Sequence, residues 1–163
     1  MEVNPLDRYP HAFFATHLRQ LTDRITEASK VIFDEYGIAT DPRTVSILIY
    51  LSGTRAATTA DIALALGHSH QLASQRIAKL IDQGLVQSYV DRRDSRRRPH
   101  RLTRKGAGEV KKLVPLIERF EQVFSALFAE IETDLSVAAR RALQAIEQRP
   151  LQLRYAADDV PNS

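Results

Sequence analysis

Two short segments, separated by three residues, constrain the fold of this chain most. Each has its own signals for the start and the end of a helix. In the first, 58–66, Thr58 and Asp61 have the spacing of a capping box, and Gly67 ends the segment. Ser69 can cap the second, in which three apolar residues share one helical face: Ala73, Ile77 and Leu80. This arrangement predicts a helix-turn-helix, in which the first helix supports the second.

The opposite face of the second segment is polar. It carries Ser69, His70, Gln71, Ser74, Gln75 and Lys79. Glutamine can pair with adenine in the major groove of DNA, and lysine suits phosphate. The alternative for each of these residues is an ordinary solvated helix face.

A strand pair with a basic loop follows at once. Side chains at 85–90 would alternate between the two faces of a strand, and the segment is rich in β-forming residues. Segment 99–103 is the predicted return strand. From Asp91 to Lys105 there are eight basic residues against two acidic ones, a net charge of +6 in a chain of +3, which leaves −3 elsewhere. Such a block indicates a polyanion-binding surface, although a solvated charged loop is the alternative.

Long apolar stripes predict two long helices around this region, at 11–36 and 108–132, and Pro115 is expected to kink or break the second. Ser136 is the predicted cap of a last helix with Leu143 and Ile146 inward. We therefore predict a helical dimerisation region at 11–36 and 107–149, a DNA-binding lobe at 41–106 and an aperiodic, mobile tail at 150–163. The stripes are too wide for a lobe of about 65 residues to cover, which favours a homodimer.

Composition excludes several classes of protein. The chain has no cysteine, hence no disulfide or thiolate site, and no apolar run of membrane-spanning length. Its N-terminus lacks the apolar core of a signal peptide, so we expect a cytoplasmic protein without membrane contact. His68 and His70 are two apart and would not share a helix face, so no metal or other cofactor is expected. No nucleophile elbow or phosphate loop is present, and an enzyme is the weakest reading.

From Thr58 to Gly106 the chain resembles the MarR/SlyA family of bacterial regulators. The matching stretches are TTADIALALG (58–67), SHQLASQRIAKLIDQGLV (69–86), DSR (94–96) and LTRKG (102–106). The resemblance implies a mainly α fold with a small β-hairpin wing, made of a winged helix-turn-helix lobe plus a long-helix dimerisation domain. It implies a homodimeric transcriptional regulator, expected to be a repressor, that binds double-stranded DNA at a palindromic operator.

The resemblance also implies site residues. Arg96 would enter the minor groove with Asp94 orienting it, and Arg97 and Arg98 would add to the basic hairpin tip. Members of this family often bind small aromatic or anionic effectors, for which the polar candidates here are His11, His17, Arg24, Tyr36 and Tyr50. The chain departs from the family at Leu72, Gln75 and the return strand, where Pro99 fits only an edge position. A winged-helix module that binds proteins instead of DNA is the alternative, but it would be expected to carry an uncharged hairpin.

Overall fold

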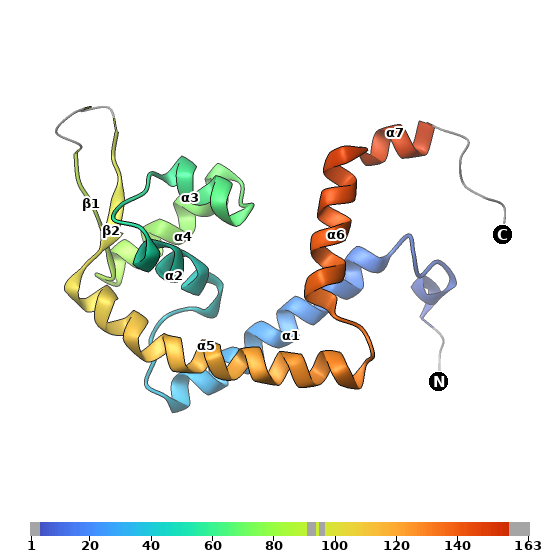
Figure 1. The fold of residues 1–163 in the computed structure, drawn as a ribbon, viewed down its shortest axis with the longest axis horizontal. Coiled ribbons are helices and arrows are strands. Elements are labelled where there is room, and N and C mark those ends of the chain that lie inside the picture. The colour runs from blue at the N-terminus through green and yellow to red at the C-terminus, as the bar shows by residue number, and fades with distance from the viewer. Residues whose placement is uncertain (1–3, 91–93, 95–96, 157–163) are drawn as a thin grey trace. The chain divides into compact units, whose positions relative to one another are not determined.

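The computed structural model describes residues 4–90, 94 and 97–156, and they fall into two compact units that divide between Val114 and Pro115 (Figure 1). The elements in chain order are η1 (Pro5–Arg8), α1 (Phe14–Glu35), η2 (Pro42–Thr44), α2 (Val45–Gly53), α3 (Thr59–Leu66), α4 (His70–Asp82), β1 (Val86–Ser88), β2 (His100–Leu102), α5 (Arg104–Glu130), α6 (Leu135–Gln148) and α7 (Leu151–Ala156). The predicted class, mainly helical with one β-hairpin, is confirmed.

The first long helix, α1, begins at Phe14, three residues later than predicted. It ends before Gly37, whose φ of +62° lies in the left-handed region that favours glycine. The helix buries only Thr26, Ser29 and Phe33, so its apolar stripe is exposed or half-buried. Asp41 then accepts a hydrogen bond from the Arg43 amide and starts η2, in which proline holds the first position that its missing N–H suits.

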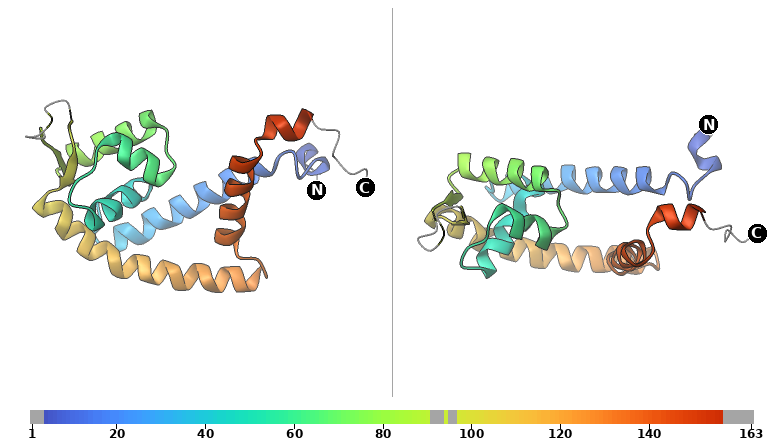
Figure 2. Two further views of the ribbon diagram at one scale, coloured as in Figure 1. Left: turned by 45° about the horizontal axis from the view of Figure 1, so that its top comes forward. Right: turned by 90° about the horizontal axis from the view of Figure 1, so that it is seen from above.

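The core of the first unit lies between α2, α3, α4 and the start of α5. Its fully buried side chains include Ile47, Leu48, Ile62, Leu80 and Leu113. Burial of each large aliphatic side chain stabilises the fold by roughly 1.5–3 kcal/mol. Figure 2 shows the short helices gathered beside the hairpin.

The hairpin is shorter than predicted. β1 and β2 pair antiparallel, with Val86 opposite Leu102 and Ser88 opposite His100. The other side of β2 forms a bridge with Ala57, through His100 N–H to Ala57 O at 2.8 Å and Ala57 N–H to His100 O at 3.1 Å. Pro99 lies just before β2, where its carbonyl accepts from the Tyr89 amide at 3.1 Å, so its missing N–H removes no hydrogen bond from the ladder.

The helix α5 joins the hairpin to the second unit. It starts four residues earlier than predicted and runs through Pro115 without a break, whereas the kink predicted as the alternative stays a prediction. At its start a Cβ on Gly106 would overlap the Leu85 carbonyl oxygen, which makes glycine the residue that this close approach needs. One turn later, Glu109 Oε1 accepts hydrogen bonds from Ala39 N at 3.2 Å and Thr40 Oγ1 at 3.1 Å.

In the second unit the predicted cap at Ser136 is wrong. Asp134 is the N-cap of α6 and accepts from the Val137 amide at 3.0 Å, while the Ser136 hydroxyl donates to the Asp134 carboxylate. A carboxylate is an equally good cap and carries the negative charge that a helix N-terminus favours. Leu143 and Ile146, predicted to point inward, are exposed.

The predicted aperiodic tail contains a helix, α7, over its first residues. Arg154 stabilises the junction because its guanidinium donates to the carbonyls of Arg149 at 2.8 Å and Ala145 at 2.7 Å. A cation at the C-terminus of a helix is favourable because it lies next to the negative end of the helix dipole. The periodicity of the sequence cannot reveal this contact, because its residues are too far apart in the chain. Residues 157–163 lie outside the described part of the chain. Among the described helices, none has the length and apolar character of a membrane span.

Candidate nucleic-acid interface

The helix-turn-helix is built as its sequence signals predict. Thr58 Oγ1 accepts from the Asp61 amide, and the Asp61 carboxylate accepts from the Thr58 amide at 2.9 Å, which completes the capping box. The Thr58 amide and the Thr58 hydroxyl both donate to Asp61 Oδ2, the hydroxyl at 2.7 Å, and these two bonds, with a smaller effect of Arg97, lower the pKa of the Asp61 carboxyl. Gly67 ends α3 in the left-handed conformation, and Ser69 Oγ caps α4 by accepting from Leu72 N at 3.2 Å.

The polar face of α4 is exposed. Ala73, Ile77 and Leu80 are buried on one side of the helix. The six predicted DNA-binding residues of this segment all lie at the surface: Ser69, His70, Gln71, Ser74, Gln75 and Lys79. The helix therefore presents a continuous row of hydrogen-bonding groups that the fold itself does not bury.

Lys79 and Gln75 lie near the loop that precedes α2. Lys79 Nζ is 4.0 Å from Asp41 Oδ2, and its side chain is 66% exposed. Both residues, with Arg43, line a hollow of about 130 Å³ against η2. An exposed ion pair at this distance is worth about 0–1 kcal/mol, so it would not prevent Lys79 from meeting a phosphate.

Sequence reasoning missed a contact between the turn and α4. Arg76 Nη1 lies 2.9 Å from His68 Nε2, eight residues away. Burial, together with the neighbouring Arg76 charge, lowers the pKa of His68, so the neutral ring can accept from the guanidinium. The spacing of the two residues in the sequence does not indicate this contact, because the turn between the helices brings their side chains together.

His100 holds the base of the hairpin. Its Nδ1 lies 2.9 Å from Ser88 Oγ of β1 and its Nε2 lies 3.0 Å from Thr59 Oγ1 of α3. The side chain is buried, and this burial lowers its pKa. Because both partners are hydroxyl groups, a neutral imidazole is satisfied at both nitrogens. The hairpin and the helix-turn-helix thus share a polar contact that fixes their relative position.

The described hairpin tip is exposed and basic. Asp94, Arg97 and Arg98 lie at the surface, and Arg97 Nη2 is 3.8 Å from Asp61 Oδ2 at the start of α3. The predicted minor-groove residue, Arg96, lies outside the described residues, as do 91–93 and 95. Nearer the base, the Arg101 guanidinium stacks 5.0 Å from the centre of the Tyr89 ring.

The effector candidates are distributed along the first unit. His11 precedes α1, His17 and Arg24 are exposed on it, and Tyr36 caps its C-terminal end with 64% of its surface exposed. Tyr50 is half-buried on α2. None of these five residues lines the hollow against η2, and their role stays a prediction. Within the described residues, no group of three or more His, Asp or Glu side chains could hold a metal ion.

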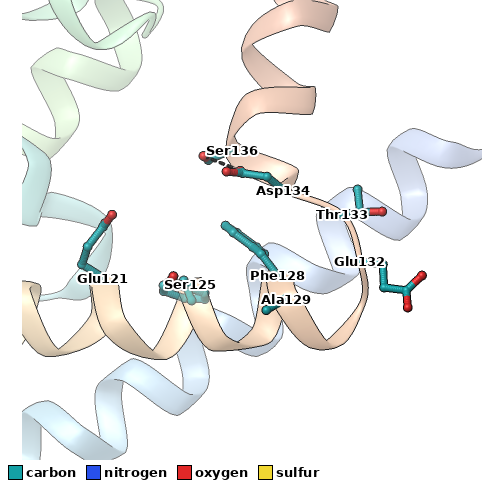
Figure 3. A pocket seen from close by; sticks show the side chains of 9 residues that line it. Glu121, Ser125, Phe128, Ala129, Glu132, Thr133, Asp134 and Ser136 are labelled. Carbon is teal, nitrogen blue, oxygen red and sulfur yellow. Dashed lines mark hydrogen bonds between the residues drawn. The ribbon is translucent and has the colours of Figure 1, made fainter.

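The second unit contains a groove of about 540 Å³ between α5 and α6 (Figure 3). Phe124 and Phe128, stacked at 6.1 Å, line it together with Ser125 and Ala129. Acidic and hydroxyl side chains surround the apolar floor: Glu121, Glu132, Thr133, Asp134 and Ser136. No residue of α6 or α7 is buried, so this unit has no closed core of its own within the described chain.

Comparison with known proteins agrees with this architecture. Residues 40–97 match the model of the MarR family. A comparison with curated proteins gives no match. Among solved structures, the chain is similar to MepR of S. aureus in its DNA complex, with 19% identity, a TM-score of 0.63 and coverage of 83% of this chain and 94% of that chain.

Two further solved structures have similar folds. The PcaV regulator of Streptomyces coelicolor, in complex with its natural ligand, is 20% identical over 91% of this chain and 99% of that one, with a TM-score of 0.60. A MarR family regulator of Silicibacter pomeroyi DSS is 20% identical over 86% of this chain and 95% of that chain, with a TM-score of 0.58. The winged-helix fold and the resemblance seen in the sequence are confirmed.

Proposed function

We propose that this chain, whose segment 40–97 is of the MarR family, is a transcriptional regulator that binds double-stranded DNA in a sequence-specific manner. The observation that carries the proposal is the exposed polar face of α4, held at a fixed position beside a basic hairpin. The fold does not use this face for its own packing. We propose no enzymatic activity for it.

In the proposed complex α4 enters the major groove, which is about 12 Å wide and admits one helix. Gln71, Ser74 and Gln75 would read base edges, and Lys79 would meet phosphate. His70 would also read a base edge, and Ser69, at the start of the helix, would approach the backbone, where amides and the helix dipole favour a negative group. MepR was solved bound to DNA, and its similarity in fold supports this placement.

The hairpin would bind next to α4, along the backbone and in the adjacent minor groove. Arg97 and Arg98 are exposed there, and the sequence adds Arg96, with Asp94 proposed to orient it. Positive side chains at this position gain from the concentrated phosphate charge. An uncharged hairpin would favour the alternative of a protein-binding module, and this hairpin is strongly charged.

We further propose a homodimer, with a second copy of this chain covering the exposed apolar side chains. At the N-cap of α1 and along it these are Phe13, Phe14, Leu18 and Val31, and in the second unit they are Val123, Ile131, Leu143, Ile146, Leu151 and Leu153. Surfaces of this kind on one chain indicate an interface. A two-fold dimer would place two α4 helices about one helical turn of DNA apart, and so on a palindromic operator.

We propose that the regulator is a repressor released by a small molecule. PcaV was solved with its natural ligand, which supports an effector for proteins of this fold. His11, His17, Arg24, Tyr36 and Tyr50 remain the proposed contacts for a small aromatic or anionic effector.

The deciding experiment selects bound sequences from a random duplex library and then measures affinity at several salt concentrations. Enrichment of one palindrome, with an affinity far above that for scrambled DNA, supports the proposal. Equal binding of all duplexes would leave only a polyanion-binding protein. Binding to none would favour the protein-interaction module.

A further inference from the structure

Arg76 lies at the border between the buried and the exposed faces of α4. Its side chain is half-buried, and its Nη1 donates to Nε2 of His68, also half-buried, across 2.9 Å. Among the described residues no carboxylate forms an ion pair with Arg76, whereas Arg43 and Lys79 each have one. The guanidinium therefore keeps its full positive charge beside an uncharged partner.

The contact also fixes where the proton of His68 lies. A guanidinium can only donate, so Nε2 must accept, and the neutral ring carries its proton on Nδ1. Nδ1 is buried and has no hydrogen-bond partner in the described part of the chain. A buried donor of this kind lowers the stability of the fold, which calls for an explanation. The contact with Arg76 supplies one, because only this tautomer can hold the guanidinium in place.

Arg76 also lines the hollow of about 130 Å³ between α4 and η2. Of the described residues, three cations line it, Arg43, Arg76 and Lys79, against the single carboxylate of Asp41, which leaves a net charge of +2. Asp41 accepts from the Arg43 amide at 2.9 Å and lies 4.0 Å from Lys79 Nζ. Asp23, which pairs with Arg43 at 3.6 Å, does not line the hollow. The hollow therefore favours an oxyanion.

The hollow adjoins the face of α4 that is proposed to enter the major groove, so the inference rests on the proposed DNA-binding function. Gln75 and Lys79, proposed to meet a base edge and a phosphate, line it together with Arg76. A helix in the major groove has a sugar-phosphate backbone along each of its sides. A cation beside the base-reading face is thus suited to the backbone.

We propose that Arg76 binds a backbone phosphate of the DNA at this hollow, and that His68 is the residue that positions it. The guanidinium has five N–H donors in a planar fork, and His68 accepts from one of them, so the others remain for two phosphate oxygens. Arg43 and Lys79 would add positive charge around the same phosphate. Because His68 already restricts the arginine side chain, less conformational entropy is lost when DNA binds.

The first test measures the affinity of the full chain for duplex DNA over a salt series. Arg76→Gln should raise the Kd for operator and scrambled duplex alike, by about tenfold or more, and reduce the salt slope by about 2 per dimer. Arg119→Gln, at an exposed position of α5 in the second unit, is the matched control and should change neither value. If the parent binds DNA and Arg76→Gln keeps its slope, this inference alone is overturned. A parent that binds no duplex overturns the proposed function itself.

The second test locates the phosphate. Duplexes of the enriched operator carry one uncharged methylphosphonate linkage at successive positions, and each is measured with the parent chain and with Arg76→Gln. We expect one linkage for each bound protomer whose neutralisation weakens the parent about tenfold but hardly affects Arg76→Gln, because the residue and the phosphate form one contact. Equal losses in both proteins at every linkage would show that Arg76 touches no phosphate.

The role of His68 is tested by removing and then restoring the acceptor. His68→Leu should raise the Kd about threefold or more, because the arginine side chain is no longer held, while the salt slope keeps the parent value, because the charge remains. His68→Gln should restore the parent Kd, since its side-chain oxygen can accept from the guanidinium. Urea unfolding shows whether both variants fold as the parent does. A parent-like Kd in His68→Leu, or no restoration in His68→Gln, would refute the positioning role.

Discussion

Arg97 of the hairpin and Asp61 of α3 face each other at 3.8 Å, and both side chains are about half exposed. The same Asp61 carboxylate closes the capping box of α3. The proposed phosphate-binding arginine therefore rests, in the absence of DNA, against the first turn of the helix-turn-helix. Because an exposed pair of this kind is weak, phosphate can replace the carboxylate.

This replacement has a measurable consequence. Arg97→Ala should weaken binding to operator and random duplex alike and reduce the slope of log affinity against log salt by about 2 per dimer. Asp61→Asn, whose amide oxygen can still accept from Thr58, should keep the slope and bind at least as tightly as the parent. Fluorescence anisotropy over a salt series distinguishes them. An unchanged slope in Arg97→Ala would show that this residue only fixes the hairpin.

Base reading by α4 is tested separately. Gln75→Ala should cost roughly 1–3 kcal/mol on the preferred operator and almost nothing on scrambled DNA, because phosphate contacts stay intact. Gln20→Ala, at an exposed position of α1, is the matched control. A competition assay at fixed salt gives both values. Equal loss on the two duplexes would assign Gln75 to the backbone instead of the bases.

Two neighbouring glycines of α5 should respond in opposite directions to the same substitution. In Gly106→Ala the new methyl group meets the Leu85 carbonyl, so we expect a loss of stability of about 1–3 kcal/mol. In Gly108→Ala the methyl group meets no atom within 4 Å, and a gain of about 0.4–1 kcal/mol is expected in a helix. Urea unfolding of the two variants measures the difference. A similar effect for both would contradict the close approach at Gly106.

Stability should fall in weak acid. The pKa of His100 is lowered by burial, and that of His68 by burial and by Arg76, so protonation favours the unfolded state. The neutral imidazoles contribute fully to the free energy of unfolding when the pH is above about 6.5, the pKa of histidine in the unfolded chain. As the pH falls below that value, this contribution is lost by at most about 1.4 kcal/mol per pH unit for each histidine. His100→Gln should flatten the decline between pH 7 and pH 5. A parent chain equally stable at both pH values would refute this.

The proposed dimer depends on apolar side chains that the single chain leaves exposed. Leu18→Glu on α1 or Leu143→Glu on α6 should shift sedimentation toward the monomer, because charge enters the interface. Leu64→Glu is the control, since Leu64 is 87% exposed on α3 and lies outside the proposed interface. If all three variants remain dimeric, the interface is elsewhere.

Local signals predicted the helix-turn-helix almost to the residue. Thr58, Asp61, Gly67 and Ser69 act within one turn of the chain, and the structure places each in its expected role. The cap of α6 was misassigned because Asp134 and Ser136 are both good caps and only the backbone path decides between them. α7 was missed because it is too short for a periodicity to show.

Contacts across the fold were the least predictable. The spacing of residues cannot reveal that Arg97 meets Asp61, that His68 holds Arg76, or that His100 joins two hydroxyl groups. The family resemblance predicted the basic hairpin but not which of its arginines has a partner within the protein. For Arg96, which lies outside the described residues, the sequence remains the only guide.

The hydrogen bonds of Glu109 to Ala39 and Thr40 make two distant parts of the chain open together. Glu109 has a side chain only 11% exposed, so separating it from the loop would leave an almost buried charge with fewer partners. The loop at 38–41 should therefore not fray independently of α5, although loops commonly do. In hydrogen exchange, the amide of Ala39 would then be protected like the first turns of α5, and this surface loop would exchange as part of one cooperative unit with the helix.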